Sequence, residues 1–293
     1  MTEKQLSKQP ADWLRRLPWF GELLADRIAR APIVPIIQLS GVIGNFGLAR
    51  RGLSLSALAE PLEQAFRMGR VKAVALAINS PGGSPVQSAL IARRIRALSD
   101  EKQIPVFAFC EDVAASGGYW LACAADEIYA DGASIVGSIG VVSANFGFPA
   151  LLERIGVERR VHTAGDKKAM LDPFRPEDPK DIKLLKEIQK DLHEQFIAYV
   201  CERRAQRINA SEKTLFSGEF WTGRKARELG LVDGIGDLRS VMREKLGESV
   251  RFRIMVPSRG WLQRKLVVER EASLAKEVMT AFEERAIWMR FGL

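Results

Sequence analysis

Short apolar runs alternate with amphipathic segments along most of this chain, from about residue 33 onward. Three of the runs, each followed by turn-forming residues, are Ile33 to Leu39, Val71 to Ile78 and Ile104 to Cys110. Runs that are apolar at nearly every position are typical of strands buried on both faces. Between the first two runs, apolar residues recur at helical spacing over residues 55–66. This succession of β-α-β units predicts an α/β fold, with a mainly parallel sheet flanked by helices.

The same alternation continues toward the C-terminus. The sequence predicts short strands at Glu127 to Ala130 and Val157 to Thr163, and a last strand at Val250 to Val256. An uncharged stretch from Val113 to Ala125 predicts a helix. From Pro179 to about Ile208, apolar residues recur at helical spacing among many charges, which predicts one long amphipathic helix.

We divide the chain into an N-terminal arm of residues 1–32, a domain of residues 33–256 and a C-terminal amphipathic helical extension of residues 257–293. The arm carries apolar residues from Trp13 to Leu24 among arginines, which suits an interfacial helix or an arm packed on another copy equally well. The extension repeats apolar residues every four positions, at Leu274, Val278, Phe282 and Ala286. Acidic residues on its polar face favour subunit packing over membrane contact.

The positive charge of the chain is concentrated at its two ends. There are 44 Lys and Arg against 36 Asp and Glu, a formal net charge of +8. Residues 1–31 hold six basic and four acidic residues, and residues 243–293 hold eleven basic and seven acidic residues. A nucleic-acid enzyme would concentrate basic residues on a binding face, and no reader motif accompanies them here. We therefore expect no nucleic-acid partner, and the ends suit peripheral contact with an anionic membrane or a protein.

No segment has the pattern of a signal peptide or a transmembrane helix. The first 30 residues contain charges of both signs and no apolar core, and the longest uncharged stretches contain several Gly, Pro, Ser and Asn residues. The three cysteines form no CxxC pair, and the two histidines leave almost no ligands for a zinc site. We expect a cytoplasmic protein without metal or cofactor, with contact to the inner face of the membrane left open.

The first candidate for chemistry is the segment from Asn79 to Gly83, with the sequence NSPGG. It places two glycines where a predicted strand ends and a helix begins, and the following Ser84 and Pro85 form a typical helix start. Glycine lets the backbone turn sharply and approach a ligand, and free amides there favour a negative oxygen. The segment suits an oxyanion hole, although an ordinary tight turn would have the same composition.

The second candidate is the segment from Ala114 to Trp120, AASGGYW, which also follows a predicted strand. Small neighbours would leave the Ser116 hydroxyl accessible, and the amide of Gly117 would point the same way as that of Gly83. The pattern resembles a nucleophile elbow without its first glycine. By itself it fits a helix start capped by serine just as well.

A serine nucleophile needs a general base, and the sequence offers few. His193 falls in a polar helical stretch, where we expect it on a solvated face, and His162 has no obvious carboxylate to orient it. Lys167 and Lys168 follow a predicted strand in a loop of small and apolar residues. A lysine acts as a base only when neutral, so burial must lower its pKa from about 10.4. The residues alone do not decide between these candidates.

Taken together, the motifs resemble the signal peptide peptidase A family of serine peptidases, peptidase family S49. The resemblance covers about residues 33 to 256 and rests on five segments in the family's order: NSPGG at 79–83, ASGGY at 115–119, GSIGV at 137–141, Lys168, and FWTG at 220–223 with GLVD at 230–233. It implies the ClpP/crotonase-like fold and catalysis by a Ser-Lys dyad.

The resemblance also implies roles for individual residues. Ser116 would be the nucleophile and Lys168 the general base, since the family's lysine stands five residues before a proline, although a shift to Lys167 stays open. Gly83 and Gly117 would supply the amides of the oxyanion hole. Ser138 would hydrogen-bond the lysine amine and hold it in place.

Family resemblance further implies a substrate class and an assembly. Members cleave hydrophobic stretches, including remnants of signal peptides, in extended form. The uncharged region from Gly132 to Val142 would form the groove and bind peptide by strand addition. Short members form homo-oligomeric rings, tetramers or octamers, in which Ser and Lys can come from adjacent subunits. Many members carry an N-terminal membrane anchor, which we do not find here.

Three other hypotheses about the function stay open. A ClpP-type Ser-His-Asp peptidase would need a histidine about 25 residues after the serine, where Val141 stands. A crotonase-like acyl-CoA enzyme would use the same two-amide oxyanion hole but leaves Ser116, Lys168 and Ser138 unexplained. A catalytically silent protein that binds peptides has no sequence feature against it.

Overall fold

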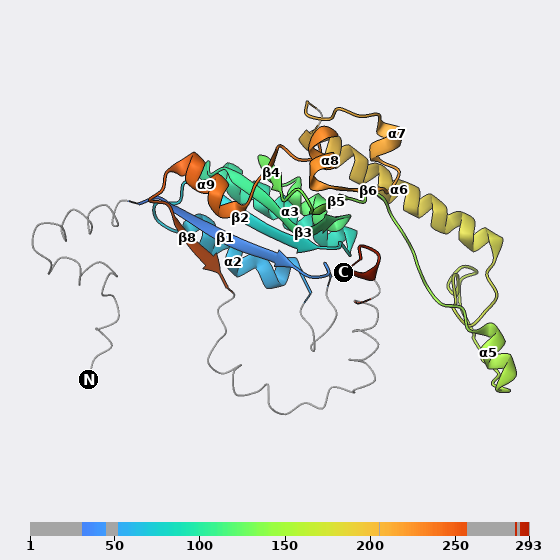
Figure 1. The fold of residues 1–293 in the computed structure, drawn as a ribbon. Coiled ribbons are helices and arrows are strands. Elements are labelled where there is room, and N and C mark those ends of the chain that lie inside the picture. The colour runs from blue at the N-terminus through green and yellow to red at the C-terminus, as the bar shows by residue number, and fades with distance from the viewer. Residues whose placement is uncertain (1–30, 45–51, 205, 257–284, 286–287, 293) are drawn as a thin grey trace, which may run out of the picture.

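A single eight-stranded sheet forms the centre of the molecule (Figure 1). The structure, a computed structural model, describes residues 31–44, 52–204, 206–256, 285 and 288–292. The strands are β1 (Ile33–Ser40), β2 (Val74–Ser80), β3 (Val106–Ala115), β4 (Glu127–Ala130), β5 (Ile135–Gly137), β6 (Phe220–Thr222), β7 (Gly234–Ile235) and β8 (Arg251–Met255). The helices are α2 (Leu55–Arg67), α3 (Pro85–Lys102), α4 (Gly117–Ala122), α5 (Pro149–Arg154), α6 (Pro179–Arg204), α7 (Glu212–Leu215), α8 (Gly223–Glu228) and α9 (Leu238–Leu246).

The strand order confirms the predicted fold class. The sheet runs β6-β5-β3-β2-β1-β8, and β4 and β7 extend from β3. In the described part of the chain, six strand pairs are parallel: β1–β2, β1–β8, β2–β3, β3–β4, β3–β5 and β4–β7. The remaining pair there, β5–β6, is antiparallel. The molecule is therefore a mainly parallel α/β sheet built from β-α-β units, as expected for a ClpP/crotonase-like fold.

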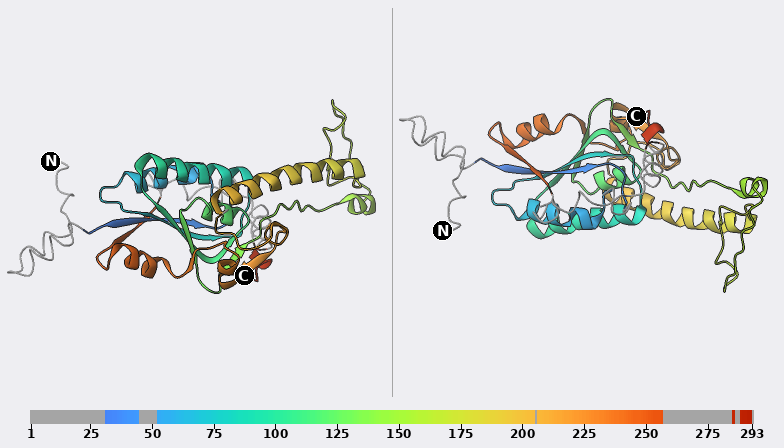
Figure 2. Two further views of the ribbon diagram at one scale, coloured as in Figure 1. Left: turned by 90° about the horizontal axis from the view of Figure 1, so that it is seen from above. Right: turned by 90° about the horizontal axis from the view of Figure 1, so that it is seen from below.

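Helices cover both faces of the sheet, with α2 and α3 on one side and α9 on the other (Figure 2). Successive side chains of β2 point to opposite faces, so Leu76 and Ile78 belong to the core cluster that contains α2 and α3. Ala75 and Ala77 belong to a second cluster with Met242 of α9. This two-sided burial is the reason that β2 is apolar at nearly every position.

The start of α3 follows the sequence prediction. Ser84 is the N-cap, its hydroxyl accepts a hydrogen bond from the Gln87 amide, and Pro85 occupies the first helical position. Proline has no N–H to leave unpaired in this first turn. The helix therefore begins directly after the two glycines of the NSPGG segment.

Two sequence predictions about elements are wrong. Residues 157–163 form no strand, because they lie in a projecting part of the chain away from the sheet (Figure 1) and a strand needs a neighbour to pair with. The helix predicted from Val113 to Ala125 exists as α4 but begins only at Gly117, since residues 113–115 are the end of β3 and pair with β5. The alanines there favour a helix intrinsically, but pairing in the sheet overrides that preference.

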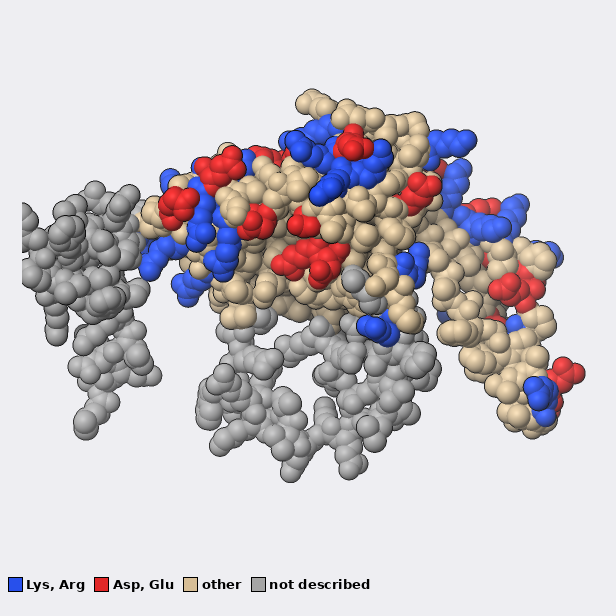
Figure 3. All heavy atoms as spheres, viewed as in Figure 1, with Lys and Arg blue, Asp and Glu red and all other residues tan. Residues whose placement is uncertain are grey.

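Most of the predicted N-terminal arm and most of the C-terminal extension lie outside the described residues. So do the predicted interfacial segment from Trp13 to Leu24 and the four-residue apolar repeat that begins at Leu274. Within the described part of the chain, no helix is both long enough and apolar enough to cross a membrane. On the face shown in Figure 3, Lys and Arg lie among Asp and Glu rather than in one continuous stripe.

The long helix α6 is fastened to the sheet domain at its C-terminal end. The Arg204 side chain is only 2% exposed, and its guanidinium donates to the Asp233 carboxylate at 2.7 Å and to the Gly230 carbonyl oxygen at 2.8 Å. Arg207 adds a second ion pair to Asp233 at 3.2 Å. Because the Arg204 side chain is buried and that of Asp233 is only 17% exposed, breaking this pair leaves groups that water cannot easily solvate.

We expect Arg204→Leu to lower the free energy of unfolding by about 3 kcal/mol, because a buried ion pair and two hydrogen bonds are lost. Urea denaturation followed by circular dichroism measures this change. The control is Lys190→Ala, which removes an exposed ion pair to Glu194 at 3.7 Å and should change stability by less than about 0.5 kcal/mol. Equal effects of the two substitutions would contradict the anchoring role.

Candidate active site

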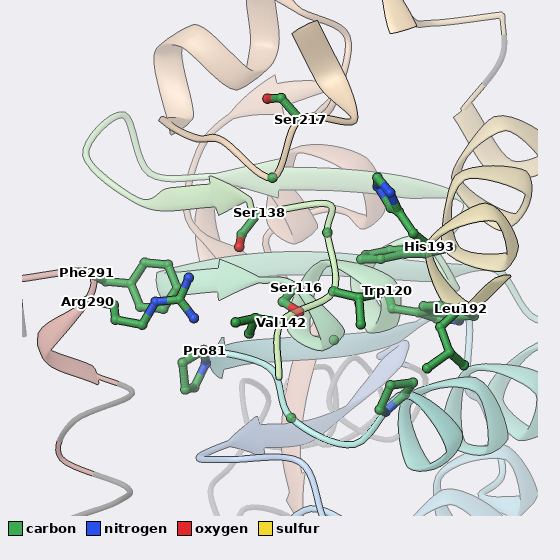
Figure 4. Close-up of a pocket in the computed structure, with 17 residues that line it drawn as sticks. Pro81, Ser116, Trp120, Ser138, Val142, Leu192, His193, Ser217, Arg290 and Phe291 are labelled. Carbon is green, nitrogen blue, oxygen red and sulfur yellow. The ribbon is translucent and has the colours of Figure 1, made fainter. Parts of the chain in front are cut away.

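A pocket of about 550 Å³ opens where parallel strands end at one edge of the sheet. The loops after β2, β3 and β5 all reach it, because parallel strands present their carboxyl ends at the same edge. Its walls come from these loops, from α6 and from residues near the C-terminus (Figure 4). The lining residues are Pro81, Gly83, Pro85, Ser116, Gly117, Trp120, Ser138, Gly140, Val141, Val142, Leu192, His193, Phe196, Ser217, Gly218, Arg290 and Phe291.

Ser116 stands between the end of β3 and the first residue of α4 in a strained conformation. Its φ is +51° and its ψ is −120°, a combination that non-glycine residues rarely adopt and that costs on the order of 1–3 kcal/mol. Its amide donates to the Gly137 carbonyl oxygen at 2.8 Å, and its hydroxyl does not cap the helix. The turn matches the strand-to-helix elbow that presents a nucleophile to a pocket.

Glycine is required in the NSPGG turn because the turn packs directly against Ser116. A Cβ on Gly82, whose φ is +103°, would lie 2.8 Å from the Ser116 Cβ and 2.9 Å from the Gly117 nitrogen. A Cβ on Gly83 would lie 2.1 Å from the Ile43 carbonyl oxygen. A Cβ on Gly118 would lie 2.5 Å from the Ser80 carbonyl oxygen. The two glycine-containing motifs are therefore in backbone contact.

Two backbone amides beside Ser116 are free to donate. Neither the Gly83 amide nor the Gly117 amide has a hydrogen-bond partner among the residues that the structure describes. The neighbouring amides are occupied, since Ser84 donates to the Ile43 carbonyl oxygen at 2.7 Å and Gly82 to the Ser80 hydroxyl at 3.2 Å. Free amides at the mouth of a pocket can hold a negatively charged oxygen.

Ser138 lies in the same pocket, on the loop that follows β5 (Figure 4). It is 7% exposed and has a φ of +53° after a Gly137 φ of +113°. Its amide donates to the Glu219 carbonyl oxygen at 2.7 Å. The structure thus brings together Ser116, Gly83, Gly117 and Ser138.

Lys168 lies away from these four residues within a single chain. It is exposed in a turn, where its amide donates to the Gly165 carbonyl oxygen at 3.1 Å, and it does not line the pocket. The adjacent Lys167 is also exposed. Figure 1 shows this region projecting from the sheet domain beside the outer part of α6. Among the residues that the structure describes, no lysine of the same chain lines the pocket beside Ser116.

His193 is in the pocket, and the expectation of a solvated position for it is wrong. A ring nitrogen, Nε2, lies 3.1 Å from the Ile139 carbonyl oxygen. The helical spacing placed His193 off the apolar stripe of α6, but it did not indicate that this part of the helix meets the loop after β5. His162, in contrast, is exposed and does not line the pocket.

Aromatic side chains form an apolar wall behind Ser116. The Trp120 ring stacks on the Phe196 ring at 4.7 Å between centroids and on the Tyr199 ring at 5.2 Å. On another side of the pocket, the Phe291 ring packs edge-on against the Phe220 ring, with 5.2 Å between the ring centroids. The pocket therefore combines polar groups around Ser116 with apolar surface.

The sequence also matches the model of a known protein family. The model of peptidase family S49 matches residues 99–249, more than half of the chain. The chain belongs to peptidase family S49. The match contains the Ser116 elbow, Ser138 and Lys168, and the NSPGG segment precedes it.

Proteins that are similar to this chain have different names. The chain is 34% identical over 179 residues to a putative signal peptide peptidase of Enterococcus faecium, covering 60% of this chain and 52% of that protein. It is 52% identical over 272 residues to a protein named Na(+)/H(+) antiporter NhaA in Brucella abortus (strain 2308), covering 89% of this chain. That alignment spans only 37% of the Brucella protein. The chain thus spans about a third to a half of these relatives.

Among solved structures, the chain is similar to a mutant of the 1510-N membrane-bound stomatin-specific protease in complex with a substrate peptide. The identity is 17% and the TM-score 0.49, with 81% of this chain and 96% of that chain covered.

We expect Gly82→Ala in this S49 chain to lower both stability and any Ser116-dependent activity, because the new methyl group would press on Ser116. Gly41→Ala is a matched control, since Gly41 has a similar φ of +101° but open space around a Cβ. Both variants bear backbone strain, and only Gly82→Ala adds the clash, which should cost about 1–3 kcal/mol more. Urea denaturation compares them, and equal losses would contradict the close packing.

Proposed function

We propose that this chain is a serine endopeptidase that hydrolyses hydrophobic or unfolded peptides, including remnants of signal peptides, through a Ser-Lys dyad. The observation that carries the proposal is the strained Ser116, which lines the pocket beside the free amides of Gly83 and Gly117. Membership in family S49 supports peptidase chemistry and disfavours the acyl-CoA alternative. The name of the Enterococcus relative supports the signal-peptide substrates.

The proposed reaction proceeds in two stages. Ser116 Oγ attacks the carbonyl carbon of the scissile bond while its proton passes to the neutral Nζ of Lys168. The Gly83 and Gly117 amides stabilise the resulting oxyanion. The tetrahedral intermediate collapses, and the ammonium of Lys168 gives its proton to the departing amine, leaving an ester on Ser116. Water, deprotonated by Lys168, then hydrolyses the ester and restores the serine.

We propose that Lys168 is supplied by a second copy of the chain. Lys168 is exposed in its own chain, whereas a general base must reach the serine proton at hydrogen-bond distance and be neutral. Docking its loop over the pocket of a neighbour would satisfy both conditions. Ser138, 7% exposed in that pocket, is then positioned to receive the amine.

The projecting part of the chain, residues 143–178, has the surface of an interaction segment. Its helix α5 has six residues and buries none of them, and so short a helix is unstable without a packing partner. Large apolar side chains are exposed along the segment: Phe146, Phe148, Leu151, Ile155, Val157 and Phe174. A concentration of this kind marks a protein interface. We propose that it docks on the next copy and builds a homo-oligomeric ring, a tetramer or an octamer.

Of the region from Gly132 to Val142 that is expected to bind peptide, β5 is already paired with β3 and β6, so the segment that follows it is the part that suits strand addition. Residues 140–147 form no helix or strand and have no backbone hydrogen bonds among the described residues. Gly140, Val141 and Val142 line the pocket. An extended backbone with unpaired amides and carbonyls can pair with an extended peptide, and the Trp120 wall can receive an apolar side chain.

A peptide-binding protein without catalysis is the second candidate. It is favoured by one observation, the position of Lys168 outside the pocket of its own chain. This candidate predicts that wild type and Ser116→Ala bind a hydrophobic peptide equally and that neither cleaves it.

We expect Ser116→Ala and Lys168→Ala to lower kcat for casein and for a detergent-solubilised hydrophobic peptide by at least about 10³-fold. Lys168→Arg should be equally inactive, because guanidinium stays charged and cannot accept the proton. Lys167→Ala is the matched control and should retain activity. Wild-type rates for Lys168→Arg would refute the assignment of the base.

Mixing inactive Ser116→Ala with inactive Lys168→Ala should restore activity if the dyad is shared between copies. With random assembly of equal amounts, about one quarter of the sites would pair an intact serine with an intact lysine. Activity is measured after the subunits are dissociated and reassembled, with native mass spectrometry to verify mixed rings. Mixed rings without any recovery would show that the two residues do not act across chains.

A further inference from the structure

His193 joins the long helix α6 to the loop that carries Ser138. Its Nε2 lies 3.1 Å from the carbonyl oxygen of Ile139, the residue directly after Ser138. A carbonyl oxygen only accepts hydrogen bonds, so Nε2 carries the proton and donates. Figure 4 shows His193 reaching into the pocket from α6.

Ile139 is the last residue of this loop that has a hydrogen bond to the rest of the domain before the chain becomes extended. The loop is fixed by two backbone hydrogen bonds, from the Ser116 amide to the Gly137 carbonyl oxygen at 2.8 Å and from the Ser138 amide to the Glu219 carbonyl oxygen at 2.7 Å. The His193 bond is the third. Residues 140–147 then have no backbone hydrogen bonds within the described part of the chain.

The helix side of this connection is rigid. One turn beyond His193, Phe196 is 3% exposed and stacks on the Trp120 ring of α4 at 4.7 Å. Farther along, the buried Arg204 fastens the end of α6 to Asp233. The helix therefore holds the His193 ring in a fixed position, and the hydrogen bond to Ile139 fixes the loop relative to the helix.

We propose that His193 is a positioning residue, which sets where Ser138 lies and the direction in which the peptide-binding segment 140–147 leaves the domain. The proposal rests on the proposed peptidase function. It assigns His193 no proton transfer, because Nε2 is committed to the Ile139 carbonyl. Among the described residues, no carboxylate lies within ion-pair distance to orient the ring as a base.

The test compares His193→Gln with His193→Leu. The glutamine amide can still donate to the Ile139 carbonyl oxygen, whereas leucine keeps bulk and loses the donor. We expect His193→Leu to lower kcat/KM for the hydrophobic peptide by about 3- to 10-fold, the size of one hydrogen bond. His193→Gln should stay within about 2-fold of wild type. Gln195→Leu, at an exposed position of the same helix, controls for the introduced leucine.

Hydrogen–deuterium exchange supplies a readout that does not depend on catalysis. In the intact protein, His193→Leu should speed exchange of the Ser116 and Ser138 amides, which are the hydrogen-bonded donors that hold this loop, and leave α6 unchanged, while His193→Gln should match wild type. If the protein proves inactive altogether, this pattern still supports the positioning role while the proposed function fails.

Three outcomes would overturn the inference. Exchange and rates equal to wild type in His193→Leu would show that the hydrogen bond positions nothing. If His193→Gln and His193→Leu lowered kcat/KM equally, a hydrogen-bond donor at this position would not be what matters. A loss of at least about 10³-fold in His193→Gln, with Lys168→Ala still active, would make His193 the general base.

Discussion

The contact between the NSPGG turn and Ser116 is the constraint on which the rest of the structure depends. Backbone meets backbone there, since a single added carbon on Gly82 would lie 2.9 Å from the Gly117 nitrogen. This approach needs β2 and β3 to be adjacent and parallel and both to end at the same edge, which the apolar strands and their two covering layers ensure. The strain at Ser116 persists because this surrounding packing is dense. The Gly83 and Gly117 amides become neighbours as a result.

The pocket of one chain holds two free amides that can stabilise negative charge, and its described lining contains no lysine. A lysine that acts as a general base must be neutral, but an exposed lysine stays charged because water favours its charged form. This requirement connects two features of the projecting segment, the exposed Lys168 and the apolar surface of residues 143–178. The same contact that buries the apolar side chains would bury the amine. Assembly and the completion of the site would then be one event.

Several local features could be read from the sequence, and others could not. Strand β4 and the Ser84 cap follow from apolar runs and capping chemistry, which act over a few residues. The place of His193 and the extension of β3 through residues 113–115 depend on contacts with residues distant in sequence, Ile139 and β5. The strand expected at 157–163 has a suitable composition but no partner strand.

The sequence by itself determined the α/β class, the positions of both glycine-containing turns and Ser116 as the candidate nucleophile. Such features follow from periodicity, from the unique backbone freedom of glycine and from motif order, all of which are local. Only the tertiary structure decided that Ser116, Gly83, Gly117 and Ser138 share one pocket, that His193 joins them and that Lys168 does not. Those relations are set by how distant segments pack, because the distance between two side chains depends on the path of the whole chain between them.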